Sequence, residues 1–296
     1  MEDAGSLAAL ILVVASFSSS RAASTRASRF FVRASLDSCA ATAARYCLYA
    51  SSWVMRSWAF SLTSLLMIIM MVVWMSISKD GTVNGFSRAD FVTYYMVGMV
   101  VRQLTAVWAS WEMDFSIREG ILSPKLLRPL HPIHNDIAAN WGEKAIRMVI
   151  VLPLVITVLW LTPGVQLDLS PLTLLLFILS IGGAWVIMFF MDYLTGLLAF
   201  WTTQVTAFIT LVEALRILFA GILAPIQMFP LWLQNIIQFL PFRYVLSFSI
   251  EIVTGRVQGA QLLFGFAMQL FWAVFMVLAV RAVWARAMRS YSAVGA

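Results

Sequence analysis

His131 and Asp136 come closest to a catalytic pattern, because their spacing is HxxxxD. In acyl transfer, a histidine at this spacing acts as general base and the aspartate orients it. Here Pro132 interrupts the pattern, and no polar domain surrounds it to shape an acyl-donor site. A membrane-embedded acyltransferase is therefore an alternative that mutation of His131 would test. With His134 these residues lack further ligands at metal-site spacing, so we expect no metal site.

Four ionisable residues fall inside apolar stretches: Arg102, Asp192, Glu213 and Arg216. Charges are costly in a bilayer, so each is a candidate for lining a substrate path. Glu213 and Arg216 lie three residues apart and are expected to pair. For Arg102 and Asp192, path lining and hydrogen bonding between helices are equally open. These charges are too few for a proton relay. Separately, Gly182, Gly183 and Gly196 predict close helix approach.

The sequence lacks a nucleotide-binding signature. No GxxxxGK[ST] pattern occurs, so this chain binds no ATP through a P-loop. If transport is driven by ATP, another subunit must bind the ATP and Mg²⁺. We therefore expect no cofactor on this chain and no enzymatic activity of its own.

The composition excludes a water-soluble fold. The chain has 296 residues, of which 61% are hydrophobic and 11% charged, with a mean hydropathy of +0.88. Soluble domains carry about a quarter charged residues. Since a span needs about 20 apolar residues, the chain can hold about six and no large soluble domain. The net charge of +6 reflects a positive-inside bias, so no nucleic-acid partner is expected.

We predict an all-α polytopic protein whose transmembrane domain covers 29–289. An extra or poorly ordered extension, 1–28, precedes it, and a cytoplasmic tail, 290–296, follows. Basic and aromatic residues alternate over 29–57, which predicts a helix lying in the membrane interface. Cys39 and Cys47 lie there, where a disulfide is improbable. The predicted spans are about 58–77, 91–111, 146–161, 172–201, 205–224 and 262–283.

The charge distribution predicts the orientation. With the N-terminus inside, inner segments carry 14 of the 20 Lys and Arg, outer segments carry four, and two lie within spans. This asymmetry places both termini in the cytoplasm. The expected location is the cytoplasmic (inner) membrane, in contact with membrane lipid.

The longest internal polar interval, 114–147, separates the second and third spans. Ser123 as N-cap and Pro124 as first residue predict a short helix over 124–128, which Pro129 and Pro132 terminate. A second helix is predicted to begin near Pro132, with Glu143 and Arg147 as an i,i+4 pair. A short, stiff, leucine-bearing projection suits docking into another protein. We call its residues 119–130 the handle.

Prolines break the apolar stretch that follows the fifth span. Pro225, Pro230 and Pro241 divide it into pieces too short to cross a bilayer. This pattern predicts a re-entrant or interfacial hairpin, which is tolerated only where protein or water satisfies its backbone.

Two motif blocks carry a family resemblance. REGILSP at 118–124 with LLRPL at 126–130 resembles the loop between the second and third spans of ABC-2 type permeases. The closest subgroup is viologen-exporter-like. FP at 229–230, WL at 232–233, LPFRY at 240–244 and EI at 251–252 resemble the same subgroup's region between the fifth and sixth spans. The resemblance covers 29–289, and the first 28 residues depart from it.

The resemblance implies the permease subunit of an ATP-driven exporter of hydrophobic or cationic compounds, lipids or glycans. It would pair with a second copy or a related permease and with two ABC ATPase subunits. The handle would then be the coupling helix seated in the ATPase, and the proline hairpin would shape the outer gate. The implied ATPase-coupling residues are Glu119, Gly120, Leu122, Ser123, Pro124, Leu126, Leu127, Arg128 and Pro129.

Two further alternatives stay open. A secondary transporter should show internal repeats and paired broken helices, whereas we find one broken region in the sequence. A membrane scaffold without transport activity would survive the loss of every intramembrane charge.

Overall fold

The computed structural model describes residues 64–78, 81–165 and 167–290. The chain divides into two units, Met1–Leu62 and Thr63–Ala296, and the described residues belong to the second. The predicted extension 1–28, the interface helix 29–57 with both cysteines, and residues 291–296 lie outside the described residues.

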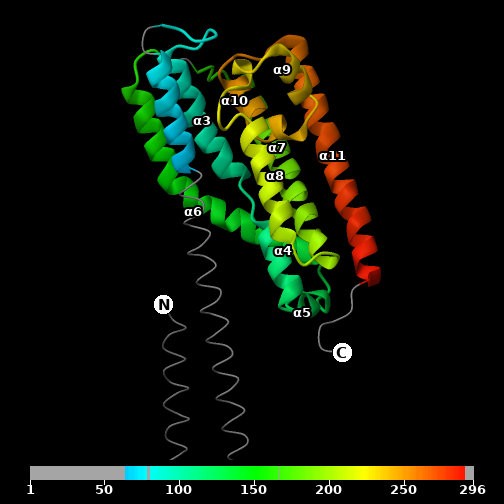
Figure 1. The fold of residues 1–296 in the computed structure, drawn as a ribbon. Helices are drawn as coiled ribbons and strands as arrows, with labels where there is room; N and C mark the ends of the chain where they lie inside the picture. The colour runs from blue at the N-terminus through cyan, green and yellow to red at the C-terminus, as the bar shows by residue number, and fades with distance from the viewer. Residues whose placement is uncertain (1–63, 79–80, 166, 291–296) are drawn as a thin grey trace, which may run out of the picture. The chain divides into compact units, whose positions relative to one another are not determined.

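The described residues form helices joined by loops, with a single isolated β-bridge, Val83 to Phe86, and no strand (Figure 1). In chain order the helices are Ser64–Ile77, α3 (Arg88–Thr105), α4 (Ala109–Arg118), α5 (Leu122–Leu126), α6 (Pro132–Leu161), α7 (Pro171–Leu197), η2 (Leu198–Phe200), α8 (Val205–Phe219), η3 (Ile226–Met228), α9 (Leu231–Ile237), η4 (Pro241–Val245), α10 (Ser247–Val253) and α11 (Gly259–Ser290).

Among the described residues, two helices are long and apolar enough to cross a membrane. They are Pro171–Phe200 and Gly259–Arg289, which confirm the predicted fourth and sixth spans as apolar helices. A third candidate is α6, whose parts Pro132–Ala145 and Arg147–Leu161 meet at a bend of 40°. The count of six spans is not confirmed.

Two predicted spans need correction. The second, 91–111, is wrong as one helix, because α3 ends at Thr105 and α4 begins at Ala109. The fifth, 205–224, is too long, because α8 ends at Phe219 and Gly221 adopts a positive φ of 88° that turns the chain. The first and third predictions agree better: helix Ser64–Ile77 lies within 58–77, and α6 contains 146–161.

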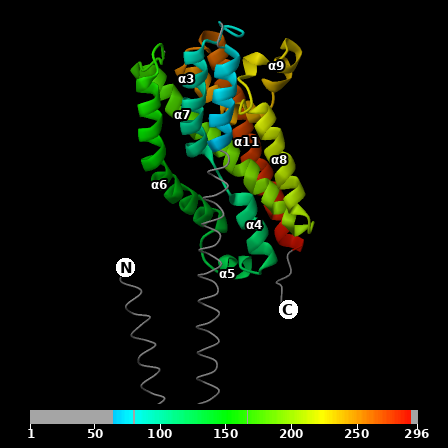
Figure 2. The same cartoon turned by 60° about the vertical axis from the view of Figure 1, so that its left-hand side comes forward.

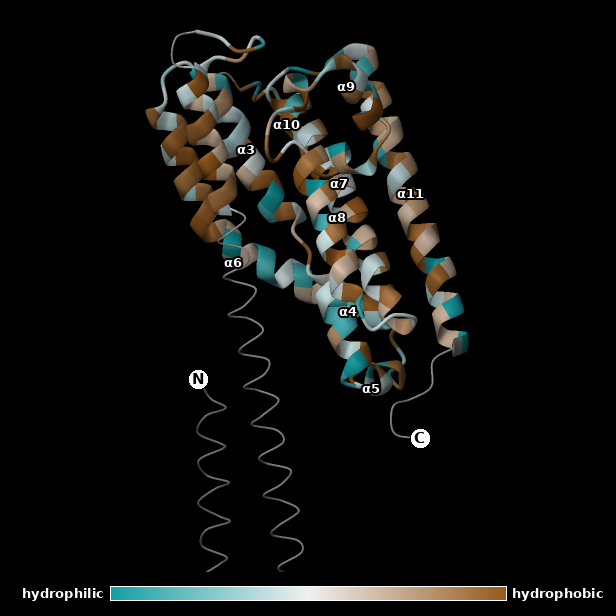
Figure 3. Cartoon of the chain, in the orientation of Figure 1, coloured by the Kyte–Doolittle hydropathy of each residue, from teal (hydrophilic) through white to brown (hydrophobic). Residues whose placement is uncertain are grey.

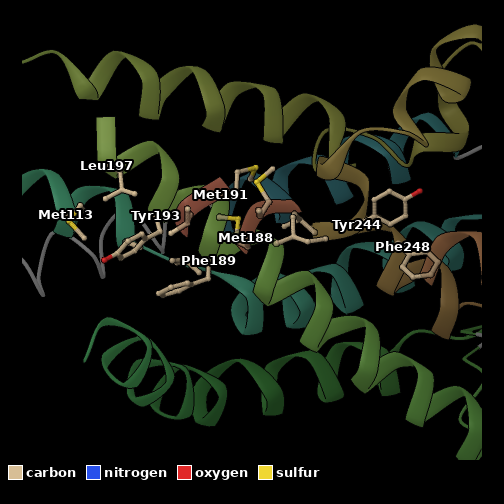
Figure 4. Close-up of a cluster of buried hydrophobic side chains, with 14 of the residues drawn as sticks. Met113, Met188, Phe189, Met191, Tyr193, Leu197, Tyr244 and Phe248 are labelled. Carbon is tan, nitrogen blue, oxygen red and sulfur yellow. The ribbon is translucent and has the colours of Figure 1, made fainter. Parts of the chain in front are cut away.

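Helix α7 is the centre around which the others pack. It contacts α11, α4, α10, η4, α3 and α8. Figure 4 shows its buried side chains Phe189, Tyr193 and Leu197, with Met113 of α4 toward one end and Phe248 of α10 toward the other. A helix that is apolar on all sides suits such a central position.

Two glycines of α7 permit close approach of its neighbours. A Cβ at Gly196 would lie 2.9 Å from Ser110 Cα and 2.8 Å from Met113 Cβ, so α4 packs directly on the α7 backbone. A Cβ at Gly183 would meet the Gln269 side chain of α11 at 2.7 Å. The close approach predicted at these two positions is confirmed. At Gly182 it is wrong, because no atom would lie within 4 Å of an added Cβ.

Polar residues are concentrated toward one end of the described unit. Figures 1 and 2 both show α5 and the C-terminal end of α11 at one end and α9 at the other. We call these the handle end and the hairpin end. Polar residues gather on α4, α5 and the first half of α6, at the handle end, whereas apolar residues dominate the lengths of the long helices (Figure 3).

The contact between α4 and α7 predicts a difference between two glycines of the same helix. Gly196→Leu forces the α4 backbone away, and such overpacking costs about 1–3 kcal/mol. Gly182→Leu adds the same side chain to open space and should leave stability unchanged. Thermal unfolding of the detergent-purified protein, followed by size-exclusion chromatography, measures both. Equal unfolding temperatures for the two variants would contradict the tight α4–α7 contact.

Candidate functional site

A break separates α3 from α4 at residues 106–108, where Val107 is buried and Ala106 and Trp108 are half-buried. The 18 residues of α3 rise about 27 Å before the break. The Ala106 carbonyl accepts hydrogen bonds from Lys144 Nζ at 2.7 Å and Asn140 Nδ2 at 3.2 Å, both on α6. Helix ends leave carbonyls without partners, and here α6 supplies the donors.

On the other side of the break, α7 supplies a hydrogen-bond acceptor to the start of α4. Helix α4 has no capping bond from its own N-cap, Trp108. Instead the Ser110 N–H donates to Asp192 Oδ2 at 3.0 Å. A carboxylate is favoured at the N-terminal end of a helix, where free N–H groups concentrate positive charge. The structure therefore shows a hydrogen bond between helices at Asp192, and path lining by this residue stays a prediction.

Arg102, Glu213 and Arg216 form one charge cluster that joins α3 to α8. Glu213 pairs with Arg216, as predicted, and its Oε1 lies 3.7 Å from Arg102 Nη2. Arg216 Nη1 also lies 2.9 Å from Met188 Sδ of α7. The Glu213 side chain is 32% exposed, whereas that of Arg216 is 10% exposed. The carboxylate is thus the most accessible charge of the cluster.

Contacts of α5 hold the handle against its neighbours. Gly120, at a positive φ of 68°, turns the chain after α4. Leu122 is fully buried in the core cluster, and Lys125 Nζ lies 3.6 Å from Asp136 Oδ1 and 3.3 Å from Ser116 Oγ. These contacts tie α5 to α6 and to α4.

The predicted bounds of the handle helix are wrong by two residues. Helix α5 runs over Leu122–Leu126, and Ile121 is its N-cap without a side-chain bond, so Ser123 is not the cap. The turn at Gly120 lets the helix start directly after it. Pro124 is then the third helical residue, where a missing N–H costs nothing because the first N–H groups of a helix have no intrahelical partner.

The tip of the handle exposes large apolar side chains. Leu127 is 89% exposed and Leu130 70% exposed, and Ile121 is also exposed. Leu126, by contrast, packs against the core cluster. The exposed leucines flank Arg128 and Pro129 in the sequence, and the described residues leave them uncovered. Glu119 is exposed as well.

His131 and Asp136 have structural roles. His131 Nδ1 accepts from the Ile133 N–H and caps α6, which begins at Pro132 as predicted. Its ring packs on Trp284 of α11 at 4.6 Å. Asp136 pairs with Lys125, and the described residues show no hydrogen bond between the two members of the HxxxxD pattern. Burial raises the pKa of Asp136, opposed by Lys125, and burial lowers the pKa of His131.

At the hairpin end, side chains donate hydrogen bonds to the backbone carbonyls that follow α8. Tyr94 OH donates to Gly221 O at 3.0 Å, and Tyr95 OH and Trp74 Nε1 donate to Leu223 O at 3.0 and 2.9 Å. Backbone that leaves helical geometry near a membrane needs such partners. The pieces between Pro225, Pro230 and Pro241 are the short helices η3 and α9, and the placement of this region as a re-entrant or interfacial hairpin stays a prediction.

A buried ion pair fixes the same region. Glu251 is 1% exposed and accepts from Arg243 Nη2 at 2.7 Å and from Gln227 Nε2 at 3.0 Å. It joins α10 to η4 and η3, so the short helices form one connected cap.

The most informative residues that the sequence did not reveal are Asn140 and Lys144. The pair Glu143–Arg147, predicted from its i,i+4 spacing, is confirmed at 2.7 Å. Asn140 and Lys144 share that spacing and bond to each other, with Nζ 2.6 Å from Oδ1. Only the fold, however, brings them to the Ala106 carbonyl.

Comparison with known proteins gives one match. A family model described as ABC-2 family transporter protein matches residues 60–295. No curated protein and no solved structure matches the chain.

The charge cluster predicts a stability loss when its carboxylate is neutralised. Glu213→Gln leaves the buried Arg216 guanidinium without its anion, which costs about 1–3 kcal/mol. Replacing both partners by leucine should recover part of this loss, because an apolar pair needs no desolvated charge. Thermal unfolding in detergent measures the change, and exposed Glu119→Gln is the matched control. A Glu213→Gln protein as stable as the wild type would show that the cluster contributes nothing.

Proposed function

The chain belongs to the ABC-2 transporter family, and we propose that it is the permease subunit of an exporter driven by a separate ABC ATPase. The handle carries the proposal. Leu122 anchors it in the core, while Leu127 and Leu130 project with 89% and 70% of their surface exposed. A buried anchor with exposed leucines at a polar end suits insertion into a groove of a soluble partner. ATP and Mg²⁺ are then held by that partner.

The connection of the handle to the long helices supports a rigid-body mechanism. Helix α4 carries the handle and is fastened to α7 through Asp192 and the close contact at Gly196. Closure of the ATPase dimer on ATP moves the handle, and α7 moves with it because packed interfaces do not deform continuously. The proline hairpin above α7 and α11 then opens or closes as the outer gate.

A second permease, identical or related, completes the path. The exposed face of α8 carries Thr206, Thr210 and the half-buried Glu213. Polar residues on a membrane helix face protein or a water-filled cavity rather than lipid. This face supports pairing of two permeases around a polar path, with Glu213 and Arg102 in its wall.

The orientation follows from the positive-inside rule. The handle end faces the cytoplasm together with both termini, and the hairpin end faces outward across the cytoplasmic membrane. The cargo is a hydrophobic or cationic compound, a lipid or a glycan. The viologen-exporter-like subgroup remains a prediction, because the matching family description names no subgroup.

The test is copurification of an ATPase from mild detergent. Leu127→Asp places a charge on the docking surface and should reduce the copurified ATPase at least tenfold. The matched control is Leu231→Asp on α9, which is 77% exposed at the opposite end and should not affect copurification. Both variants should elute from size exclusion as the wild type does.

The contrary outcomes are specific. If wild-type permease brings down no ATPase even after crosslinking, the exporter proposal fails, and the secondary-transporter or scaffold alternative takes its place. If Leu127→Asp and Leu231→Asp retain equal amounts of ATPase, the handle is not the docking surface.

A further inference from the structure

We propose that Lys144, together with Asn140, is a positioning residue that clamps the break between α3 and α4 and so transmits movement of the handle to α3. The inference rests on the proposed function for the source of that movement. The clamp itself is a property of this chain.

The contacts define a closed loop of elements. Helix α4 leads from the break to the handle, and the handle returns to α6 through the ion pair of Lys125 with Asp136 at 3.6 Å. Helix α6 then returns to the break, where Lys144 Nζ donates to Ala106 O at 2.7 Å. The three elements are α4, the handle and α6. They are joined at the turn at Gly120, at the Lys125–Asp136 pair and at the bond of Lys144 to Ala106 O, and such a closed arrangement resists sliding of one element past another.

Asn140 extends the clamp to the central helix. Its Nδ2 donates to Ala106 O at 3.2 Å, and its Oδ1 accepts from Lys144 Nζ and from Trp185 Nε1 of α7 at 2.9 Å. The Trp185 ring lies 5.1 Å from that of Trp141 on α6. One amide thus connects the end of α3, the polar half of α6 and α7.

Burial makes these bonds hard to replace. Lys144 is 2% exposed, so water has little access to its amino group, and the Ala106 carbonyl that it meets belongs to a half-buried residue. Without the clamp, the half-buried Ala106 carbonyl would lose both of its side-chain donors, which costs free energy and is relieved by opening of the joint to water. A loosened joint lets α4 and the handle move while α3 stays in place.

The position along α6 fits a transmitting role. Lys144 lies directly before the 40° bend between Pro132–Ala145 and Arg147–Leu161. The apolar half beyond the bend belongs to the helix that packs along α3. Movement of the handle therefore reaches α3 through the break and through α6 together, and both routes pass Lys144.

The experiment uses the permease–ATPase complex in nanodiscs. Cys39 and Cys47 are replaced by serine, and a single cysteine at Leu231, exposed at the hairpin end, reports the state of that end through its rate of labelling by a membrane-impermeant maleimide. In the wild type, trapping with ATP and vanadate changes the labelling rate. Lys144→Met should abolish most of that change while the ATPase remains bound and continues to hydrolyse ATP. Lys144→Arg should restore it in part.

The control and the contrary results separate the clamp from the proposed function. Arg289→Met removes an exposed cation of α11 and should behave as the wild type. If Lys144→Met keeps the full nucleotide-dependent change, the clamp is overturned and the exporter proposal stands. If Lys144→Met also loses the ATPase, its role is structural and the clamp is overturned.

A second measurement needs no ATPase. Hydrogen exchange of peptides covering residues 104–112 should be at least tenfold faster in Lys144→Met than in the wild type or Arg289→Met, with peptides of α11 unchanged. If no ATPase copurifies, the exporter proposal fails, and hydrogen exchange at residues 104–112 is then the only test of whether Lys144 clamps the break. Unchanged exchange at the break overturns it.

Discussion

The structure depends on one constraint: where a helix breaks among packed neighbours, the free backbone groups must find hydrogen-bond partners outside that helix. At residues 106–108, α6 supplies donors to the carbonyl end of α3, and α7 supplies a carboxylate to the N–H end of α4. Charged or polar groups of the right sign meet each end, as the dipoles of helix termini favour. Because the partners come from two different helices, satisfying the break also fixes α3, α4, α6 and α7 relative to one another. Because α4 leads directly into the handle, this arrangement also determines where the handle lies.

The same constraint explains the hairpin end. Where α8 stops, three hydroxyls and an indole satisfy the carbonyls of Ala220, Gly221 and Leu223. Gln269 of α11 donates to carbonyls of Ser180 on α7 and Tyr244 on η4. Both ends of the unit are thus built from interrupted helices whose free groups are satisfied by neighbours, while α7 and α11 run uninterrupted between them. Rigid long helices with polar joints at their ends suit a protein that passes movement from one side of a membrane to the other.

Features that depend on neighbouring residues could be predicted from the sequence, whereas contacts between distant segments could not. Pro132 predicted the start of α6. The i,i+3 and i,i+4 spacings predicted the Glu213–Arg216 and Glu143–Arg147 pairs, because such pairs depend only on helix geometry. The sequence did not predict the break at 106–108, because residues 105–108 (TAVW) contain neither proline nor glycine. The backbone groups at the break are bonded instead by residues that are distant in the sequence. For Asp192 the sequence left hydrogen bonding between helices open, but not its partner at the start of α4, and the clamp by Lys144 was not predicted, because both depend on contacts between distant segments. The start of α5 was displaced because the turn at Gly120, rather than a capping serine, determines it.

The most direct test of the account is a distance between α4 and α7 in the two nucleotide states. Spin labels at the exposed positions Phe115, on α4, and Trp201, just after α7 and η2, report it by pulsed electron paramagnetic resonance in the permease–ATPase complex. If α4 and α7 move as one body, the distance distribution is the same without nucleotide and after trapping with ATP and vanadate. A shift of that distribution on trapping would show that the handle moves independently of α7, and would contradict the rigid connection through Asp192 and Gly196.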